Sequence, residues 1–142
     1  MYYEIKNMEI IYQVEKNLSV EEFRNLLIRS TLGERRPIDD SNKLEKMCKN
    51  ADIMLTARFE GKLVGVARSL SDFVYATYLS DLAVDEAFQK LGIGKKLIAE
   101  TKKLVQGKLI LLSAPAAIEY YPKIGMTQFE YSFFLENLDD LK

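Results

Sequence analysis

The sequence predicts one α+β domain built in three layers, with helices on both faces of a sheet. Three observations support this. Short β-rich runs alternate with amphipathic helical patterns along the 142 residues, two β-rich runs meet at a tight turn, and KLILLS (108–113) is apolar enough for a strand covered on both faces. A chain of this length buries a single core, so we expect one domain over residues 1–142.

The N-terminal part is expected to form a strand and two helices. MEIIYQVE (8–15) is typical of a first strand. Ser19 followed by Glu22 forms a capping box ahead of a helix expected over about 20–32. After the interrupting segment GERRPIDD, a short second helix is expected from 41 to 49.

The middle of the chain predicts three strands and a longer helix. DIMLTARFE and KLVGVARSL are β-rich runs separated at Glu60-Gly61-Lys62, which is a hairpin signal. YATYLSDLAV reads as a third strand of this group. Apolar residues at helical spacing then favour a helix from Gly92 to about Gln106.

The C-terminal part predicts a strand, a helix and a last strand. KLILLS is the strand, and PAAIEYYPKIG favours a helix that starts at Pro115 and is short or bent, because Pro122 lies inside it. FEYSFFLENL alternates as an antiparallel strand does. The expected order is therefore β-α-α-β-β-β-α-β-α-β.

Composition excludes several classes of function. The chain has no histidine and one cysteine, Cys48, so histidine-bound zinc, Ser-His-Asp or Cys-His catalysis and an internal disulfide are excluded, and we expect no metal. The net charge of -1 gives no footprint for nucleic acid, and no apolar run is long enough to span a membrane. The N-terminus does not resemble a secretory signal, so we expect a cytoplasmic protein.

The stretch AVDEAFQKLGIGKKLIAE (83–100) is a candidate phosphate-binding loop. Glycines ahead of a helix let backbone N–H groups approach a phosphate, and the helix N-terminus favours negative charge. The Walker A and dinucleotide patterns are not met. A third pattern is met, with Gln89, Gly92 and Gly94 following a strand that ends in Leu82 and Val84. The alternative is that the two glycines only serve a tight turn.

At these residues the chain resembles the Gcn5-related N-acetyltransferases (GNAT), which carry this motif at the pyrophosphate of acetyl-CoA. AIEYYPKIGM (117–126) is similar to the second signature of the family, an aromatic-Tyr pair followed by Lys, an aliphatic residue and Gly. The two motifs lie about thirty residues apart, as they do in the family. The resemblance implies the GNAT fold, a mixed, mostly antiparallel sheet of six to seven strands flanked by about four helices.

The resemblance also implies acetyl-CoA as cofactor. Its pantetheine arm would follow the backbone of the strand ending at Val84, and its diphosphate would meet the glycine loop, where the lysines either add charge or form a solvated face. Ala114 stands where many relatives have an asparagine, so that contact is either missing or supplied by Ser113. The residues assigned to acetyl-CoA are Leu82, Ala83, Val84, Gln89, Lys90, Leu91, Gly92, Ile93, Gly94, Lys95, Lys96, Ser113 and Tyr121.

The candidate catalytic residues are Tyr121, Asp81 and Ser80. Tyr121 matches the tyrosine that protonates the departing thiolate in many relatives. Tyr78 and Ser80 stand where several relatives place a carboxylate base, and neither is acidic. Asp81 lies beside them, but strand alternation directs it to the face opposite Ser80, so it is either structural or catalytic. The base is then Asp81, an ordered water, or none if the amine arrives neutral.

The acceptor is expected under GERRPIDD, where Arg35 and Arg36 either hold a carboxylate of the substrate or pair with nearby acidic residues. The residues expected to line the same cleft are Arg68, Asp72, Tyr75 and Tyr78. The function expected is acetyl transfer to a primary amine of a small molecule such as an amino acid, by direct transfer in a ternary complex. The alternatives are a non-catalytic acyl-CoA-binding module and a protein lysine or N-terminal acetyltransferase. A homodimer through FEYSFFL is possible, although core packing explains that segment equally well.

Overall fold

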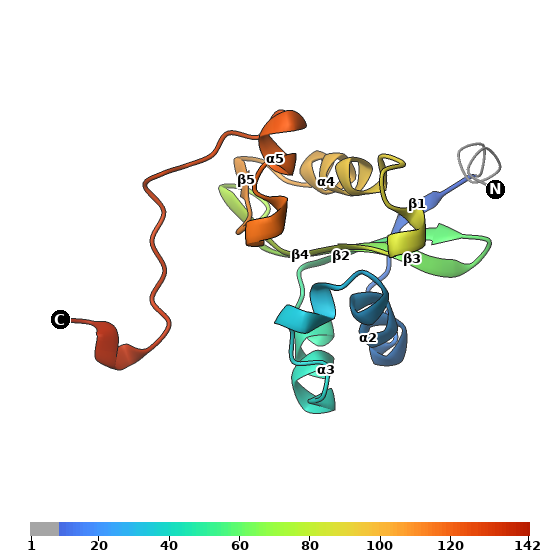
Figure 1. Cartoon of the computed structure of the whole chain (residues 1–142), viewed down its shortest axis with the longest axis horizontal. Helices are drawn as coiled ribbons and strands as arrows, with labels where there is room; N and C mark the ends of the chain where they lie inside the picture. The colour runs from blue at the N-terminus through green and yellow to red at the C-terminus, as the bar shows by residue number, and fades with distance from the viewer. Residues whose placement is uncertain (1–8) are drawn as a thin grey trace. The chain divides into compact units, whose positions relative to one another are not determined.

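The computed structural model describes residues 9–142. The chain divides into two compact units, Met1–Leu112 and Ser113–Lys142, and each is described by itself. In the first unit, a five-stranded sheet lies between helix α4 on one face and helices α2 and α3 on the other (Figure 1). The three layers expected from the sequence are therefore present in this unit. A single domain over 1–142 stays a prediction.

The sheet has the strand order β1-β2-β3-β4-β5, in which the first four strands are antiparallel and β5 is parallel to β4. The predicted hairpin between β2 and β3 is confirmed. Its turn residues Glu60 and Gly61 both have positive φ, 47° and 82°, as the tightest hairpin turns need. The strands are β1 (Ile11–Val14), β2 (Ile53–Phe59), β3 (Lys62–Ser71), β4 (Ala76–Val84) and β5 (Lys108–Ile110). The predicted first strand began at residue 8, which lies outside the described residues.

The helices of the first unit follow the sequence signals closely. Ser19 caps α2 by accepting a hydrogen bond from the N–H of Glu22, whereas the Glu22 carboxylate binds Arg58 instead of closing the capping box. The helix ends earlier than expected, and a 3-10 turn follows it. The elements are α2 (Val20–Arg29), η1 (Leu32–Arg35), α3 (Ser41–Lys49), η2 (Glu86–Phe88) and α4 (Ile93–Lys103).

Two apolar clusters hold the layers of the first unit together. One lies between the sheet and α4 and includes Leu79, Ile93 and Leu97. The other lies between the sheet and the α2–α3 layer and includes Phe23 and Leu26, both without solvent exposure. Because each face of the sheet is covered by its own helices, the positions of β4 and of the N-terminus of α4 are fixed by packing.

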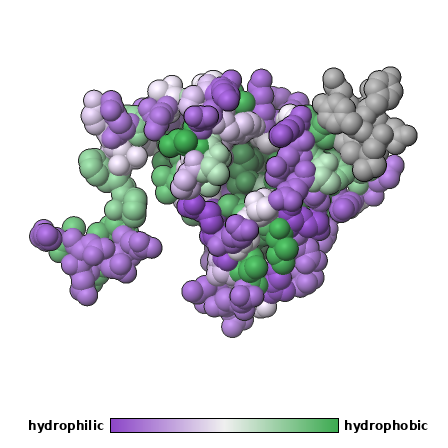
Figure 2. Space-filling model, in the orientation of Figure 1, coloured by the Kyte–Doolittle hydropathy of each residue, from purple (hydrophilic) through white to green (hydrophobic). Residues whose placement is uncertain are grey.

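The second unit contains short helical turns and no strand. They are η3 (Pro115–Ala117), α5 (Tyr120–Lys123) and η4 (Leu138–Asp140), so the prediction of a short or bent helix is confirmed. The strand predicted over FEYSFFLENL is wrong for the described chain. The segment has the apolar alternation of a strand, but no neighbouring strand pairs with it, and the side chain of Phe133 is 94% exposed. Green apolar residues are visible along this segment in Figure 2.

Over residues 9–142 the sheet therefore has five strands instead of six to seven. KLILLS also differs from expectation, because only its first three residues form β5 and Ile110 is 53% exposed. An apolar run becomes a strand buried on both faces only where helices cover both faces of the sheet. This condition is not met at the edge strand β5. Across residues 9–142, no helix has the length and apolarity needed to cross a membrane.

Candidate active site

The edge of β4 that faces away from β3 is only partly paired. β5 pairs with the start of β4, from Ala76 opposite Lys108 to Tyr78 opposite Ile110, where β5 ends. The N–H of Asp85 bonds to the carbonyl of Val64 on β3, so by alternation the backbone groups of Leu82 and Val84 face the other edge. Within the first unit, the strand predicted to hold a pantetheine arm thus offers the backbone groups of Leu82 and the N–H of Val84 on one side, while Gln89 binds the carbonyl of Val84.

β4 contains a bulge at Ser80. Arg68 on β3 lies opposite Asp81, whereas the next residue, Ser69, lies opposite Leu79, so Ser80 is the extra residue. The bulge places Ser80 and Asp81 on the same side, where both side chains bind the guanidinium of Arg68. The expectation that Asp81 lies on the face opposite Ser80 is therefore wrong, because strict alternation fails at a bulge.

Asp81 is fully buried and holds two arginines. One carboxylate oxygen accepts from Nε of Arg36 and the other from Nε of Arg68. Arg36 also donates to the carbonyl of Ser80 at 2.9 Å, and Arg68 donates to the Ser80 hydroxyl at 2.9 Å and to the carbonyl of Met47 at 3.4 Å. The cluster therefore joins the end of η1, helix α3 and strands β3 and β4, and it carries a net charge of +1.

The loop between β4 and α4 presents a series of backbone donors. Lys90 and Gly92 adopt positive φ, 63° and 85°, and Gly92 begins α4 without a side-chain cap. Gln89 binds the end of β4 by donating its side-chain amide to the carbonyl of Val84 at 3.0 Å. Among residues 9–142, the N–H groups from 90 to 95 have no hydrogen-bond partner. Such a series of free donors at a helix N-terminus fits an anionic group.

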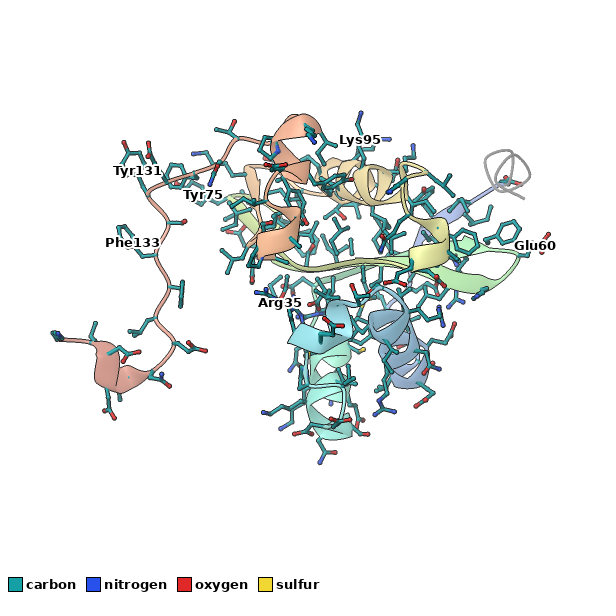
Figure 3. All side chains as sticks on the ribbon, viewed as in Figure 1. Arg35, Glu60, Tyr75, Lys95, Tyr131 and Phe133 are labelled. Carbon is teal, nitrogen blue, oxygen red and sulfur yellow. The ribbon has the colours of Figure 1, made fainter. Side chains whose placement is uncertain are left out.

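Two of the three lysines around this loop are free of acidic partners in the described part of the chain. Lys96 forms an ion pair with Glu100 at 3.1 Å, and its ammonium lies 6.0 Å from the ring centroid of Tyr12. Lys90 and Lys95 are exposed and have no such pair. Figure 3 shows Lys95 on the α4 side of the sheet.

The arginines predicted for the acceptor differ in their surroundings. Arg36 and Arg68 are bound to Asp81 instead of to the neighbouring acidic residues of GERRPIDD. Arg35 is exposed, and in the described chain its guanidinium has no ion pair or hydrogen bond. It lies on the α2–α3 side of the sheet (Figure 3). Tyr78 is half-buried on β4, two residues before the bulge.

Ser113 and Tyr121 belong to the second unit. The Ser113 hydroxyl donates to the carbonyl of Ala114 at 2.7 Å. Tyr121 lies in α5, with its ring edge-on to Tyr120 at a centroid distance of 5.2 Å. Burial raises the pKa of Tyr121 above its usual value of 10.0, and Tyr120 adds to this effect. The phenol therefore stays protonated at neutral pH.

Asp85 is a buried residue between β4 and the glycine loop, and it was not among the site residues predicted from the sequence. Its Oδ1 accepts from the N–H of Ala87 and so caps η2, and its Oδ2 accepts from Arg29 at 2.8 Å. Asp85 thereby fixes the chain between β4 and the glycine loop. The available signal was an Asp directly after a strand and before a helical turn, which is a typical N-cap.

The family model of the acetyltransferase (GNAT) family matches residues 20–126. This region is more than half of the chain and contains both motifs. The chain belongs to the GNAT acetyltransferase family and is an N-acetyltransferase, with acetyl-CoA as the donor that goes with this membership.

Curated relatives agree with this assignment. An uncharacterized N-acetyltransferase of Pyropia yezoensis is 27% identical over 85% of this chain and 72% of its own length. A chloroplastic GCN5-related N-acetyltransferase of Arabidopsis thaliana is 28% identical over 63% of this chain, and the match spans about half of that relative, 48%.

Solved structures show the same fold at low identity. A probable acetyltransferase from meticillin-resistant Staphylococcus aureus has a TM-score of 0.74 at 18% identity, covering 91% of this chain and all of that one. An aminoglycoside acetyltransferase from an uncultured soil metagenomic sample, in complex with sisomicin, has a TM-score of 0.67 at 23% identity, covering 91% and 96%. An aminoglycoside N-acetyltransferase in complex with CoA has a TM-score of 0.67 at 18% identity, covering 93% and 97%.

Proposed function

We propose that the chain transfers the acetyl group of acetyl-CoA directly to a primary amine of a small molecule that also carries a carboxylate, such as an amino acid. The observation that carries the proposal is the row of free N–H groups from 90 to 95, which follows the partly paired edge of β4. A backbone edge followed by anion donors suits a ligand with an extended amide-containing arm and a diphosphate.

The residues of the first unit fit acetyl-CoA in both parts. Leu82 and the N–H of Val84 offer backbone groups to the arm, and Ala83 between them packs into the α2–α3 core and holds the strand in place. The donors from Lys90 to Lys95 suit the diphosphate, and the free ammonium groups of Lys90 and Lys95 add positive charge. When bound, acetyl-CoA supplies an activated acyl group. Ser113 stays a predicted contact.

Acetyl transfer needs a neutral amine and a proton for the departing thiolate. Tyr121 suits the second role because its phenol carries a proton at neutral pH, as an ordinary tyrosine does. Asp81 is poorly suited to the first, since both of its oxygens accept hydrogen bonds from guanidinium groups. We therefore assign deprotonation to an ordered water or to an amine that arrives neutral.

Arg35 supports the choice of acceptor. Its guanidinium is exposed beside a cluster that already carries a net positive charge, so this side of β4 favours an anionic substituent over a polyamine. In this proposal Arg35 contacts the acceptor directly. The shape of the site is then set by Arg36, Arg68 and Tyr78.

The test is thiol release from acetyl-CoA with purified protein and a panel of amino acids, polyamines, aminoglycosides and lysine peptides. We expect release with carboxylate-bearing amines, and at least tenfold lower kcat/KM for Arg35→Ala on these acceptors. Lys102→Ala serves as a surface-cation control, because Lys102 is exposed in the last turn of α4. Binding of acetyl-CoA without release under any condition would instead favour a non-catalytic acyl-CoA-binding module. Release with peptides alone would favour a protein acetyltransferase.

Two further parts of the proposal concern the protein in the cell. We expect a cytoplasmic enzyme, although two curated relatives are named as chloroplastic. We also expect no nucleic-acid or membrane partner, and a homodimer is compatible with the exposed apolar C-terminal segment. Fractionation and light scattering of the full chain test these points.

A further inference from the structure

The buried cluster around Asp81 holds the hydroxyl group of Ser80 in place. Arg68 donates from Nη2 to the oxygen of Ser80 at 2.9 Å, so one lone pair of this oxygen is occupied by a cationic donor. A serine hydroxyl has one proton to donate, and among residues 9–142 no group accepts the proton of Ser80. Ser80 is only partly buried. Its hydroxyl proton is therefore open to solvent or to a bound ligand.

The direction of this donor is set by the bulge. Without the bulge, strict alternation would point Ser80 and Asp81 to opposite faces of the sheet, and Arg68 could not bind both side chains. With it, Asp81 fixes Arg68, Arg68 fixes the oxygen of Ser80, and Arg36 holds the carbonyl of the same residue at 2.9 Å. Both polar groups of Ser80 are thus held by arginines that share one carboxylate.

We propose that Ser80 is a specificity-determining residue that donates its hydroxyl proton to a carboxylate oxygen of the acceptor, and that Asp81 is a positioning residue that acts through Arg68 and not a base. This rests on the proposed function, because it takes the acceptor to lie on the α2–α3 side of β4. The neighbouring guanidinium groups favour an anionic partner for the donor. Arg35, from the adjacent η1 turn, would bind the same carboxylate.

The experiment compares Ser80→Ala and Ser80→Thr with the wild type, using the best amino-acid acceptor from the panel. For Ser80→Ala we expect acceptor KM to rise 5- to 20-fold, kcat to stay within threefold and the Kd of acetyl-CoA to be unchanged, with a lower Tm because Nη2 of Arg68 loses its acceptor. Ser80→Thr keeps the hydroxyl and should restore KM to within twofold. Ser71→Ala is the matched control, because it removes another hydroxyl of the same sheet outside the cluster, and its KM should stay within twofold.

The role of Asp81 is tested by a double-mutant cycle and a pH profile. If Asp81 acts through Ser80, the double variant Ser80→Ala with Asp81→Asn should raise acceptor KM no further than the larger single effect, and the acidic limb of the pH–rate profile should persist. Loss of that limb in Asp81→Asn, with kcat reduced a hundredfold, would make Asp81 the base and overturn the proposal. If Asp81→Asn does not fold, the comparison of Ser80→Ala with Ser80→Thr still decides.

The two proposals fail in different ways. No thiol release by the wild type with any amine removes the proposed function and this inference together. Release by the wild type with unchanged acceptor KM in Ser80→Ala overturns the inference alone.

Discussion

Gly107 lies against the backbone of Tyr75, so that a Cβ on Gly107 would stand 1.9 Å from the Tyr75 carbonyl oxygen. The N–H groups on either side of Gly107 donate to this loop, Gln106 to the carbonyl of Phe73 and Lys108 to that of Tyr75. The glycine also has a φ of 74°. This contact brings the start of β5 beside β4, and with it the point where the two strands separate.

Gly107→Ala should therefore destabilise the protein strongly. The left-handed backbone alone costs about 1–2 kcal/mol for a residue with a Cβ, and the contact with Tyr75 adds to it. Urea unfolding measures the loss. Gly61→Ala is the matched control, since Gly61 has a φ of 82° with open space around the added Cβ, and it should lose only the backbone part. Equal losses in both variants would contradict the contact argument.

Ser69→Ala should leave stability unchanged or increase it. The Ser69 side chain is fully buried, and its hydroxyl has no hydrogen-bond partner among the described residues. Removing an unpaired buried hydroxyl removes a group that was desolvated without compensation. Ser30→Ala is the control, because the Ser30 hydroxyl donates to the carbonyl of Leu27, and it should cost about 1 kcal/mol. A loss for Ser69→Ala as large as that of the control would contradict this account.

Acid should weaken the link between β1 and β2. Hydrogen bonds from Arg58, opposed in part by burial, lower the pKa of Glu15 below its usual value of 4.5. A carboxyl group with a lowered folded-state pKa stabilises the protein above its unfolded-state pKa, and this contribution is lost as pH falls through the folded-state pKa. Glu15→Gln should therefore be less stable than the wild type at pH 7, and the difference should shrink below about pH 4.5. Urea unfolding between pH 3 and pH 7 would contradict this if the two curves stayed parallel.

Cys48 should react slowly with alkylating reagents. Burial raises the pKa of its thiol to about 11, although the positive charge of Arg68 opposes this. At pH 8, a thiol with this pKa has on the order of 200-fold less thiolate than a free cysteine, and only the thiolate reacts. Iodoacetamide labelling followed by mass spectrometry should show slow modification of the folded chain and fast modification in urea. Equal rates in the two states would contradict the raised pKa.

Tyr121→Phe should lower kcat without changing the folded state. A positioned proton donor contributes about 10²–10⁴-fold to a rate, so a loss of about a hundredfold is expected if Tyr121 protonates the thiolate. The loss should be smaller with an acyl donor whose thiol leaves more easily. Tyr131→Phe removes the same hydroxyl from a side chain that is 69% exposed, and it should keep the wild-type kcat. An unchanged kcat for Tyr121→Phe would remove this residue from the mechanism.

Local signals predicted local structure well. The turn at Glu60-Gly61 and the cap at Ser19 depend on residues next to one another, and both are present. The last strand was predicted from alternation alone, and alternation does not say whether a neighbouring strand is available for pairing. The site shows the same contrast. The glycine loop was found from its spacing, whereas the pairing of Arg36 with Asp81 joins residues 45 positions apart and leaves no local signal.

The bulge at Ser80 also affects how the sequence of β4 aligns with the sequence of a regular strand. Leu79 packs into the cluster under α4, and so do Leu82 and Val84, although three positions separate Leu79 from Leu82. The two halves of β4 are therefore out of phase by one residue. Removing Ser80 from the chain would leave a regular strand, because Leu79, Asp81 and Leu82 would then alternate while each keeps its present face. An alignment of this strand with a regular one therefore matches apolar positions on both sides of Ser80 only when it places a gap there.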